Sequence, residues 1–288
     1  MNTYDTKLAI IGRGVWPSKI KSSLESNFQD LDAKVFSARD AVSNSKMVQK
    51  DLFNVIWIAT QPSLQLKLLE KLLNMSQTII LEKPLGSNSA EIESLIQFLQ
   101  EHPIGVVAPS NPWSYETTCL EAVELMKNEG LDAAKVEITR RGPNRRTYLS
   151  PVGDWIPHDL YLLEKIFDSE LITFNEIVGT RESAVANFFC EGFQTQVTVN
   201  SGYAQERVSE IVYSKSSKEI KANILSGEIS INGIAHNFRA RDSYDAISRN
   251  YLDAKNWGRE RFINTAKLQS EVFSSLERLK ESFLIYHS

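Results

Sequence analysis

The sequence predicts a two-domain α/β protein: a doubly wound parallel sheet comes first, and an open, largely antiparallel sheet covered by helices follows. Three observations predict this. The chain has 288 residues, more than one typical domain needs. Its first part alternates short apolar runs with amphipathic segments, as parallel strands and crossover helices do. Its later part has longer segments in which apolar and polar residues alternate, as in antiparallel strands. We expect the domains to span residues 1–110 and 111–288.

The first expected strand is KLAII, an apolar run that ends at Gly12. The next segment carries Ile20, Leu24 and Phe28 at four-residue spacing, which places them on one face of a helix. The same alternation continues along the first domain. It predicts further strands at 33–38, 55–59, 78–81 and 104–108, and helices at 17–28, 64–73 and 89–99.

The second domain shows period-two alternation from residue 130 onward, for example in AAKVEITRR and FQTQVTVNSGYA. Such alternation gives a sheet one apolar face and one polar face. We expect helices to cover the apolar face and solvent or a partner subunit to meet the other. A last helical stretch is expected over residues 245–284.

Composition excludes several classes of protein. Hydrophobic residues make up 42% and charged residues 24% of the chain, which is ordinary for a globular protein. The net charge of −4 gives no basic field for nucleic acid. Cys119 and Cys190 have no CxxC spacing, so we expect core thiols and neither disulfides nor a metal site. Without a signal peptide or an eighteen-residue apolar run, we expect a cytoplasmic protein that does not enter membranes.

A local basic cluster consists of Arg140, Arg141, Arg145 and Arg146. We interpret it as a solvated loop face. A site for an anionic substrate is the alternative.

The sequence GRGVWP follows the first strand and opens a helix, which is the context of a dinucleotide-binding turn. Gly12 permits the tight turn, and Gly14 lets the backbone approach a pyrophosphate at the helix N-terminus. Pro17 stands where a third small residue is usual. An ordinary strand-to-helix turn is the alternative. The cofactor-binding residues expected here are Gly12, Arg13, Gly14, Val15 and Trp16.

The end of the second strand indicates which dinucleotide binds. NAD-specific enzymes place an acidic residue there, but this chain has Ser37, Ala38 and Arg39. A guanidinium can pair with a 2′-phosphate, so we expect Ser37 and Arg39 to favour NADP over NAD. Asp40 could take the acidic role if the register shifts by one or two residues.

Two further motifs carry candidate catalytic groups. Glu82 and Lys83 end the fourth strand, at the sheet edge where open α/β folds bind ligands. A lysine there can hydrogen-bond a substrate oxygen during hydride transfer. Asp154 and His158 are four residues apart, on one face of a helix, and an imidazole can shuttle a proton near neutral pH. Alternatively Lys83 lies at the surface, Asp154 caps the helix and His158 is a buried polar group.

Together these motifs resemble the glucose-fructose oxidoreductase, inositol dehydrogenase and rhizopine catabolism family, Gfo/Idh/MocA. The sequence has GRGVWP, IATQPS, EKP and GDWIPHD in the order that this family shows. The resemblance implies a catalytic group of Lys83, Asp154 and His158, with His158 as acid/base. It also implies that Thr60, Gln61 and Pro62 line the dinucleotide cleft, that Glu82 and Lys83 lie near the nicotinamide, and that a cis bond precedes Pro84.

The departures from the family are Pro17, the segment Thr60 to Gln65 in place of TPxxxH, and a shorter chain. Our leading hypothesis is an NAD(P)-dependent oxidoreductase that transfers hydride between nicotinamide and a sugar, nucleotide sugar or cyclitol. The alternatives are a catalytically silent sensor of a dinucleotide or sugar, and a reductase of an imine or tetrapyrrole. The resemblance also implies a homodimer or homotetramer that forms through the second sheet.

Overall fold

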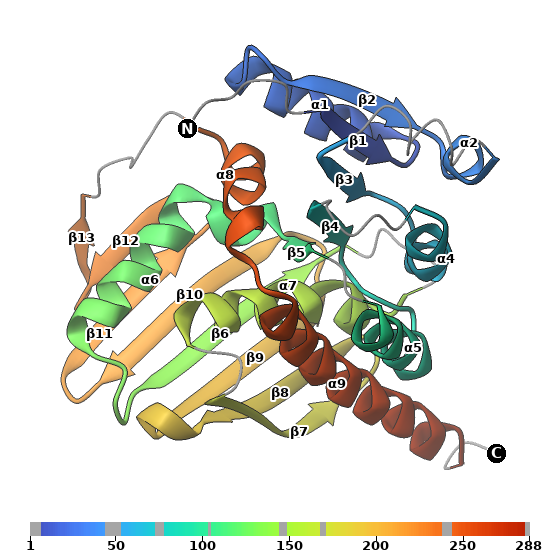
Figure 1. The fold of residues 1–288 in the computed structure, drawn as a ribbon. Helices are drawn as coiled ribbons and strands as arrows, with labels where there is room; N and C mark the ends of the chain where they lie inside the picture. The colour runs from blue at the N-terminus through green and yellow to red at the C-terminus, as the bar shows by residue number, and fades with distance from the viewer. Residues whose placement is uncertain are drawn as a thin grey trace. The chain divides into compact units, whose positions relative to one another are not determined.

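The computed structural model describes residues 7–43, 53–72, 78–102, 105–143, 149–167, 171–237 and 244–285, with side chains up to residue 279 (Figure 1). The chain forms two compact units. Unit 1 comprises Met1–Gly86, Ala90–Pro112 and Tyr244–Ala266. Unit 2 comprises Ser87–Ser89, Trp113–Ser243 and Lys267–Ser288. Among the residues described, no helix has both the length and the apolar composition that a bilayer crossing requires.

Unit 1 contains a five-stranded parallel sheet in the order β2-β1-β3-β4-β5, as the doubly wound prediction requires. The strand order reverses beside β1, so β2 and β3 flank it on either side. The bounds are β1 Lys7–Ile11, β2 Asp32–Phe36, β3 Val55–Ile58, β4 Thr78–Glu82 and β5 Val106–Ser110. All five expected strands are confirmed to within about two residues at each described end.

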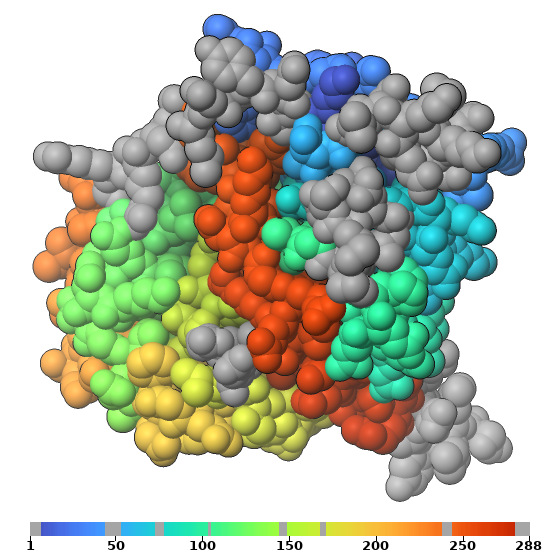
Figure 2. All heavy atoms as spheres, viewed as in Figure 1, coloured from blue at the N-terminus to red at the C-terminus, as the bar shows by residue number. Residues whose placement is uncertain are grey.

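The central strands of this sheet are buried on both faces, which explains why their sequences are continuous apolar runs. Ile10, Trp57 and Ile80 lie side by side in register across β1, β3 and β4, and none is exposed. Helices flank the sheet, and the surfaces of α4 and α5 lie next to each other in Figure 2. Their bounds are α1 Val15–Asn27, α2 Ala38–Ser43, α4 Pro62–Leu72 and α5 Ser89–Glu101.

Helix α8 (Ala246–Asp253) belongs to unit 1 although it comes late in the sequence. Its Asn250 side chain accepts a hydrogen bond from the backbone N–H of Asn111 (2.8 Å) and donates one to the carbonyl of Pro109 (3.1 Å). Asp245 caps the helix by accepting from Ser248 N–H and is also bonded to Ser23 of α1. These contacts attach α8 to the end of β5 and to α1.

The expected C-terminal helix is interrupted. A short 3-10 turn, η4 (Ala254–Asn256), follows α8, and α9 begins only at Arg259 and ends at Ile285. Trp257 between them is extended (φ −79°, ψ 125°), which breaks the helical hydrogen-bond pattern.

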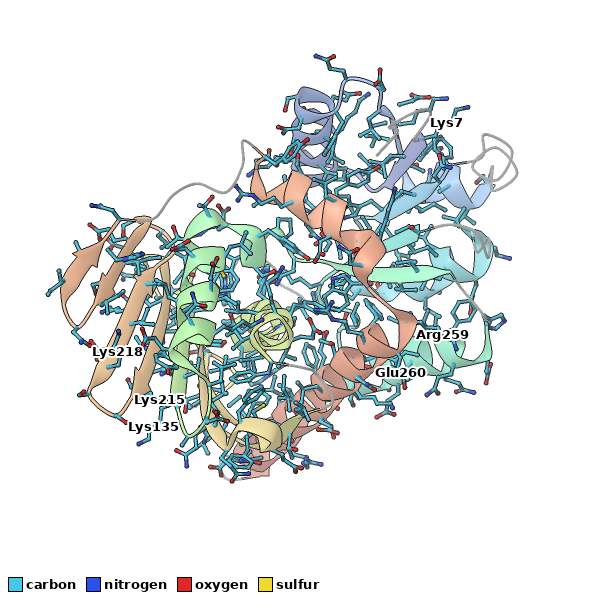
Figure 3. The ribbon with its side chains drawn as sticks, turned by 60° about the vertical axis from the view of Figure 1, so that its left-hand side comes forward. Lys7, Lys135, Lys215, Lys218, Arg259 and Glu260 are labelled. Atoms are coloured by element: carbon cyan, nitrogen blue, oxygen red, sulfur yellow. The ribbon has the colours of Figure 1, made fainter. Side chains whose placement is uncertain are left out.

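Unit 2 contains an eight-stranded sheet in the order β13-β12-β11-β10-β6-β9-β8-β7. Among the strand pairs that the structure describes in this sheet, only β6–β9 is parallel, so the largely antiparallel prediction is confirmed. The bounds are β6 Lys135–Gly142, β7 Ile172–Gly179, β8 Ser183–Cys190, β9 Thr195–Tyr203, β10 Val208–Lys215, β11 Lys218–Asn223, β12 Glu228–Ile231 and β13 Ile234–His236. Figure 3 shows Lys135, Lys215 and Lys218 at one end of β6, β10 and β11.

Helices α6 (Thr117–Glu129) and α7 (Pro151–Ile166) and the later part of α9 cover one face of this sheet. The core between them includes Ile138 of β6, Leu163 of α7 and Val272 of α9, all without exposure. Burial raises the pKa of the Cys119 thiol to about 12, as expected of a core thiol.

The other face of the sheet carries mainly polar side chains. Asn200 accepts from Arg141 Nη2 (2.9 Å) and donates to Glu137 (3.3 Å), and Asn187 donates to Glu176 (3.1 Å). Alternation along the strands therefore separates an apolar face from a polar one, as the sequence predicts.

We predict that Gly179→Ala strongly destabilises unit 2. Gly179 has φ +135°, a region nearly restricted to glycine, and an added Cβ would lie 2.4 Å from the Ser183 carbonyl oxygen. The substitution should lower the free energy of unfolding by about 3 kcal/mol. In urea unfolding this appears as a lower midpoint concentration with an unchanged m-value.

Gly233→Ala is the matched control. Gly233 also has a positive φ (+76°), but an added Cβ would meet no atom within 4 Å. Its cost should be about 1 kcal/mol. Equal losses in the two variants would show that the Ser183 contact does not matter.

Candidate functional site

Unit 1 has a cavity of about 350 Å³ at the carboxyl ends of β1, β2 and β3. This is the sheet edge where doubly wound folds bind ligands. The cavity brings together six of the residues that the sequence predicts to bind cofactor. They are Gly12, Arg13, Ser37, Arg39, Thr60 and Gln61.

The glycine turn has the geometry that a dinucleotide needs. An added Cβ at Gly12 would lie 2.2 Å from the Ala59 carbonyl oxygen, so only glycine fits there. Gly14 precedes α1 with φ +98°, and no side chain caps the helix N-terminus. The first backbone N–H groups of α1 therefore have no side-chain partner at this position, and a pyrophosphate suits such a helix N-terminus.

Pro17 packs directly against Gly12. An added Cβ at Gly12 would lie 2.9 Å from Cγ of Pro17. The proline ring is buried and lies in the first turn of α1, where its missing N–H costs nothing. Because Gly12 has no side chain, the ring and the turn fit together.

The charged residues around the cavity are positive. Arg13 and Arg39 line it, and neither forms an ion pair or hydrogen bond with a residue that the structure describes. Ser37 caps α2: its hydroxyl accepts from the backbone N–H of Asp40 (3.0 Å) and donates to the Asp40 carboxylate (2.5 Å). Asp40 is therefore engaged in a cap, and the donors at the cavity suit a phosphate.

The other six predicted cofactor residues are not among those that line this cavity: Gly14, Val15, Trp16, Pro62, Glu82 and Lys83. Val15 is 85% exposed, and Pro62 is buried at the start of α4. The Trp16 indole N–H donates to Glu82 Oε1 (2.5 Å), which also accepts from Ser110 Oγ. Trp16 therefore links the glycine turn to the segment that carries Lys83.

Gln65 holds this lysine segment, and the sequence analysis gave it no role. Its side chain is fully buried, and Nε2 donates to the carbonyls of Glu82 (2.7 Å) and Pro84 (3.2 Å), on either side of Lys83. The sequence did single out this position, because Gln65 stands where the TPxxxH pattern of the family has its histidine. The Lys83–Pro84 bond is cis, as the resemblance implies.

Helix α7 carries Asp154 and His158. Ser150 is the N-cap, because its hydroxyl accepts from Gly153 N–H (3.1 Å), so the alternative in which Asp154 caps the helix is wrong. Asp154 is buried in the first turn. His158 is half-buried one turn later, with its ring 6.0 Å from that of Trp155. The helix thus places a carboxylate and a partly accessible imidazole four residues apart.

The structure corrects the interpretation of the basic cluster. Arg140 lies in β6 and is only 4% exposed, so it is not on a solvated loop. Its Nε donates to the fully buried Asp159 (2.8 Å), and its guanidinium lies 3.1 Å from the ring centre of Trp113. Arg145 and Arg146 lie outside the described residues.

The predicted catalytic residues are divided between the two units. Lys83 is buried at the end of β4 in unit 1, next to Glu82. Asp154 and His158 lie on one helix of unit 2. Asp154 and His158 therefore lie together on α7 of unit 2, and Lys83 lies at the end of β4 in unit 1.

Residues 13–107 match the family described as oxidoreductase family, NAD-binding Rossmann fold, GFO_IDH_MocA. No curated protein matches the chain in sequence. Among solved structures, UDP-N-acetylglucosamine 3-dehydrogenase GnnA from Acidithiobacillus ferrooxidans is similar, with a TM-score of 0.69 and 16% identity over 95% of this chain and 98% of that one.

Two other solved structures share the fold. KijD10, a 3-ketoreductase from Actinomadura kijaniata in complex with TDP-benzene and NADP, has a TM-score of 0.69 and 12% identity over 90% of this chain and 94% of that one. Scyllo-inositol dehydrogenase from Lactobacillus casei has a TM-score of 0.68 and 14% identity, over 95% and 97%. These likenesses extend the fold comparison beyond the matched segment into unit 2. Residues 13–107 therefore match the NAD-binding Rossmann fold of the Gfo/Idh/MocA oxidoreductase family, and the likeness of the rest of the chain to these solved structures is one of fold.

Proposed function

We propose that this protein is a cytoplasmic, NADP-preferring oxidoreductase that interconverts a hydroxyl and a keto group on a sugar-like substrate. The observation that carries the proposal is the cavity of about 350 Å³ in which the glycine turn meets Arg13 and Arg39. In this proposal residues 1–110 bind the cofactor, and residues 111–288 bind substrate and form the subunit interface.

The preference for NADP follows from charge. A 2′-phosphate needs cationic donors, and Arg39 follows β2 at the position that contacts the adenosine ribose in this fold. NAD would need an acidic acceptor there, but the nearby Asp40 carboxylate accepts from Ser37. When bound, the cofactor supplies or accepts the hydride.

The proton chemistry falls to residues of the chain. His158 takes the proton of the substrate hydroxyl during oxidation and returns it during reduction. Asp154, one helical turn away, orients the imidazole. Lys83 donates a hydrogen bond to the reacting oxygen, and Gln65 fixes the backbone on both sides of that lysine.

The substrate class rests on analogy as well as on the site. The similar structures are named for a UDP-sugar, a 3-keto compound and an inositol. All are compatible with an acid/base histidine that acts on a hydroxyl carbon. A silent sensor, or a reductase of an imine or tetrapyrrole, remains the competing function, because one fold hosts several activities.

We predict that His158→Ala abolishes turnover and leaves NADPH binding nearly unchanged. Turnover is measured with a panel of keto-sugars and polyols, and NADPH binding is measured by fluorescence titration. His236→Ala is the control, because His236 lies on β13 and pairs with Glu121. Parallel loss of NADPH binding would contradict the role given to His158. Turnover by the wild-type chain would exclude the silent sensor.

We predict that Arg39→Gln weakens NADPH binding about tenfold or more and changes NADH binding little. Loss of one charge-assisted hydrogen bond to the 2′-phosphate has this size. Lys34→Gln removes the same charge from β2 at a residue that does not line the cavity, and it should have little effect. Wild-type protein that binds NADH as tightly as NADPH would remove the basis for an NADP preference.

We also propose a homodimer or homotetramer that forms through the second sheet. Val178 of β7 pairs with Val185 of β8 on the polar face and is 57% exposed, so it offers apolar area for an interface. Val178→Glu should shift light scattering toward the monomer mass. A wild-type monomer at micromolar concentration would refute the assembly.

A further inference from the structure

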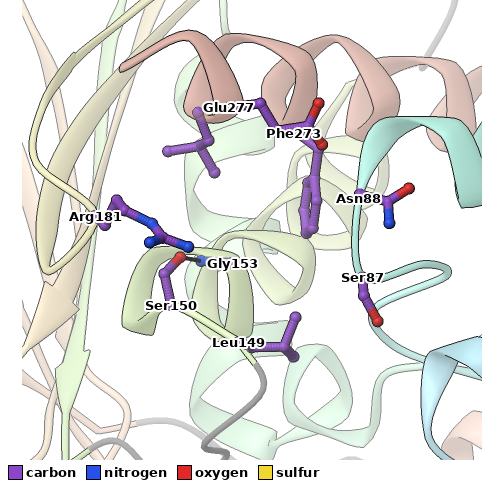
Figure 4. Close-up of a pocket in the computed structure, with 9 residues that line it drawn as sticks. Ser87, Asn88, Leu149, Ser150, Gly153, Arg181, Phe273 and Glu277 are labelled. Atoms are coloured by element: carbon purple, nitrogen blue, oxygen red, sulfur yellow. Dashed lines mark hydrogen bonds between the residues drawn. The ribbon is translucent and has the colours of Figure 1, made fainter. Parts of the chain in front are cut away.

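Unit 2 contains a cavity of about 360 Å³ that no proposed step uses. This volume is within the range of small-molecule sites. Its walls come from the start of α7, the β7–β8 hairpin, α9 and the short segment before α5. Figure 4 shows residues that line it, among them Asn88, Ser150, Arg181, Phe273 and Glu277, and Leu276 also lines it.

The hairpin that carries Arg181 has a tightly specified backbone. The Thr180 hydroxyl accepts from the N–H groups of Glu182 (3.3 Å) and Ser183 (3.2 Å). Gly202 lies against the same turn, where an added Cβ would be 2.5 Å from the Glu182 carbonyl oxygen. With the glycine at position 179, these contacts fix the backbone from which Arg181 extends.

The two charged side chains that line this cavity, Arg181 and Glu277, differ in their hydrogen-bond partners. Arg181 forms no hydrogen bond or ion pair with any residue that the structure describes, and Figure 4 shows its guanidinium directed toward Ser150 and Gly153. The Glu277 carboxylate, in contrast, already accepts from the N–H (2.9 Å) and the hydroxyl (3.0 Å) of Ser89. Arg181 is exposed at the rim of the cavity, so its guanidinium is accessible to a ligand, and the ligand group that suits it best is an oxyanion.

The remaining wall is suited to a sugar ring. Phe273 and Leu276 of α9 present an aromatic and an aliphatic surface, and Asn88 adds an amide. An apolar wall with a few polar groups is the usual composition of a small-molecule site. The cavity also reaches Gly153, which directly precedes Asp154 in α7.

We propose that this cavity binds an oxyanion, a phosphate or a carboxylate, carried by the sugar-like substrate, and that Arg181 is its principal contact. The proposal rests on the proposed function and narrows the substrate to anionic sugars. A substrate anchored here has its anion beside the first turn of α7, the helix that carries His158. The neutral polyols are then poor substrates.

The test uses the full-length protein and three probes: inorganic pyrophosphate, glucuronate and glucose. Calorimetry is done with and without saturating NADPH, because pyrophosphate can also enter the cofactor cavity. Pyrophosphate or glucuronate should bind to NADPH-saturated protein in the millimolar range or tighter, and glucose should not. Binding of pyrophosphate alone identifies a phosphate as the anion, and binding of glucuronate alone identifies a carboxylate.

Variants locate the site. Arg181→Gln should weaken binding of the anion about tenfold or more, and Arg181→Lys should lose less because one charge remains. Lys135→Gln, an equal change of charge at an exposed residue that does not line the cavity, should bind like the wild type. Unchanged binding by Arg181→Gln, or equal binding of glucose, overturns the proposal.

NADPH binding to the same samples separates the two proposals. If NADPH binds and no anion does, the anion site is wrong and the proposed oxidoreductase stands. If the anions bind through Arg181 and NADPH does not, the oxidoreductase proposal fails and the chain keeps an anion site without its assigned reaction.

Discussion

The buried ion pair between Arg140 and Asp159 is the constraint on which unit 2 depends. The transfer of each charge from water to the protein interior costs several kcal/mol, so the pair is stable only because hydrogen bonds and ring contacts surround both groups. Burial lowers the pKa of the Arg140 guanidinium below its usual value, and the Asp159 carboxylate partly offsets this. Asp159 also accepts from Ser201 of β9 (3.4 Å), and Trp113 stacks on the guanidinium. The pair thus joins β6, β9 and α7 at one point.

This pair fixes the rotation of α7. Asp159 directly follows His158, and consecutive residues on a helix point about 100° apart. When Asp159 is held in the core by Arg140, His158 must lie toward the edge of the buried face, where it is half-buried. A group that exchanges protons with a substrate needs such partial access. Removal of either charge would leave the other buried and unpaired, at a cost of about 3–5 kcal/mol.

Unit 1 positions its residues mainly through backbone contacts. The Gly12 N–H donates to the Phe36 carbonyl (2.8 Å), and Ala59 N–H donates to the Ile11 carbonyl (2.8 Å). These bonds extend the sheet into the loops that form the cofactor cavity. A side chain holds the segment around Lys83: the Gln65 amide donates to the carbonyls of Glu82, the last residue of β4, and of Pro84. Together these contacts hold the loops on which the proposed chemistry depends.

The sequence by itself determined the strands of unit 1, the alternating sheet of unit 2 and the glycine turn, because each depends on local periodicity and on backbone conformations that few residues tolerate. Period-two alternation along β6 also indicates that Arg140 shares the buried face of Val136 and Ile138. Its positive charge instead led to the prediction of a solvated loop. Only the tertiary structure decided that Arg140 is buried, that α8 joins unit 1 and that Gln65 holds the lysine segment. The reason is physical: a charge or an amide can be buried only where a partner satisfies it. Asp159, Pro109 and Glu82 come from elements that are distant in the sequence or separated by a helix.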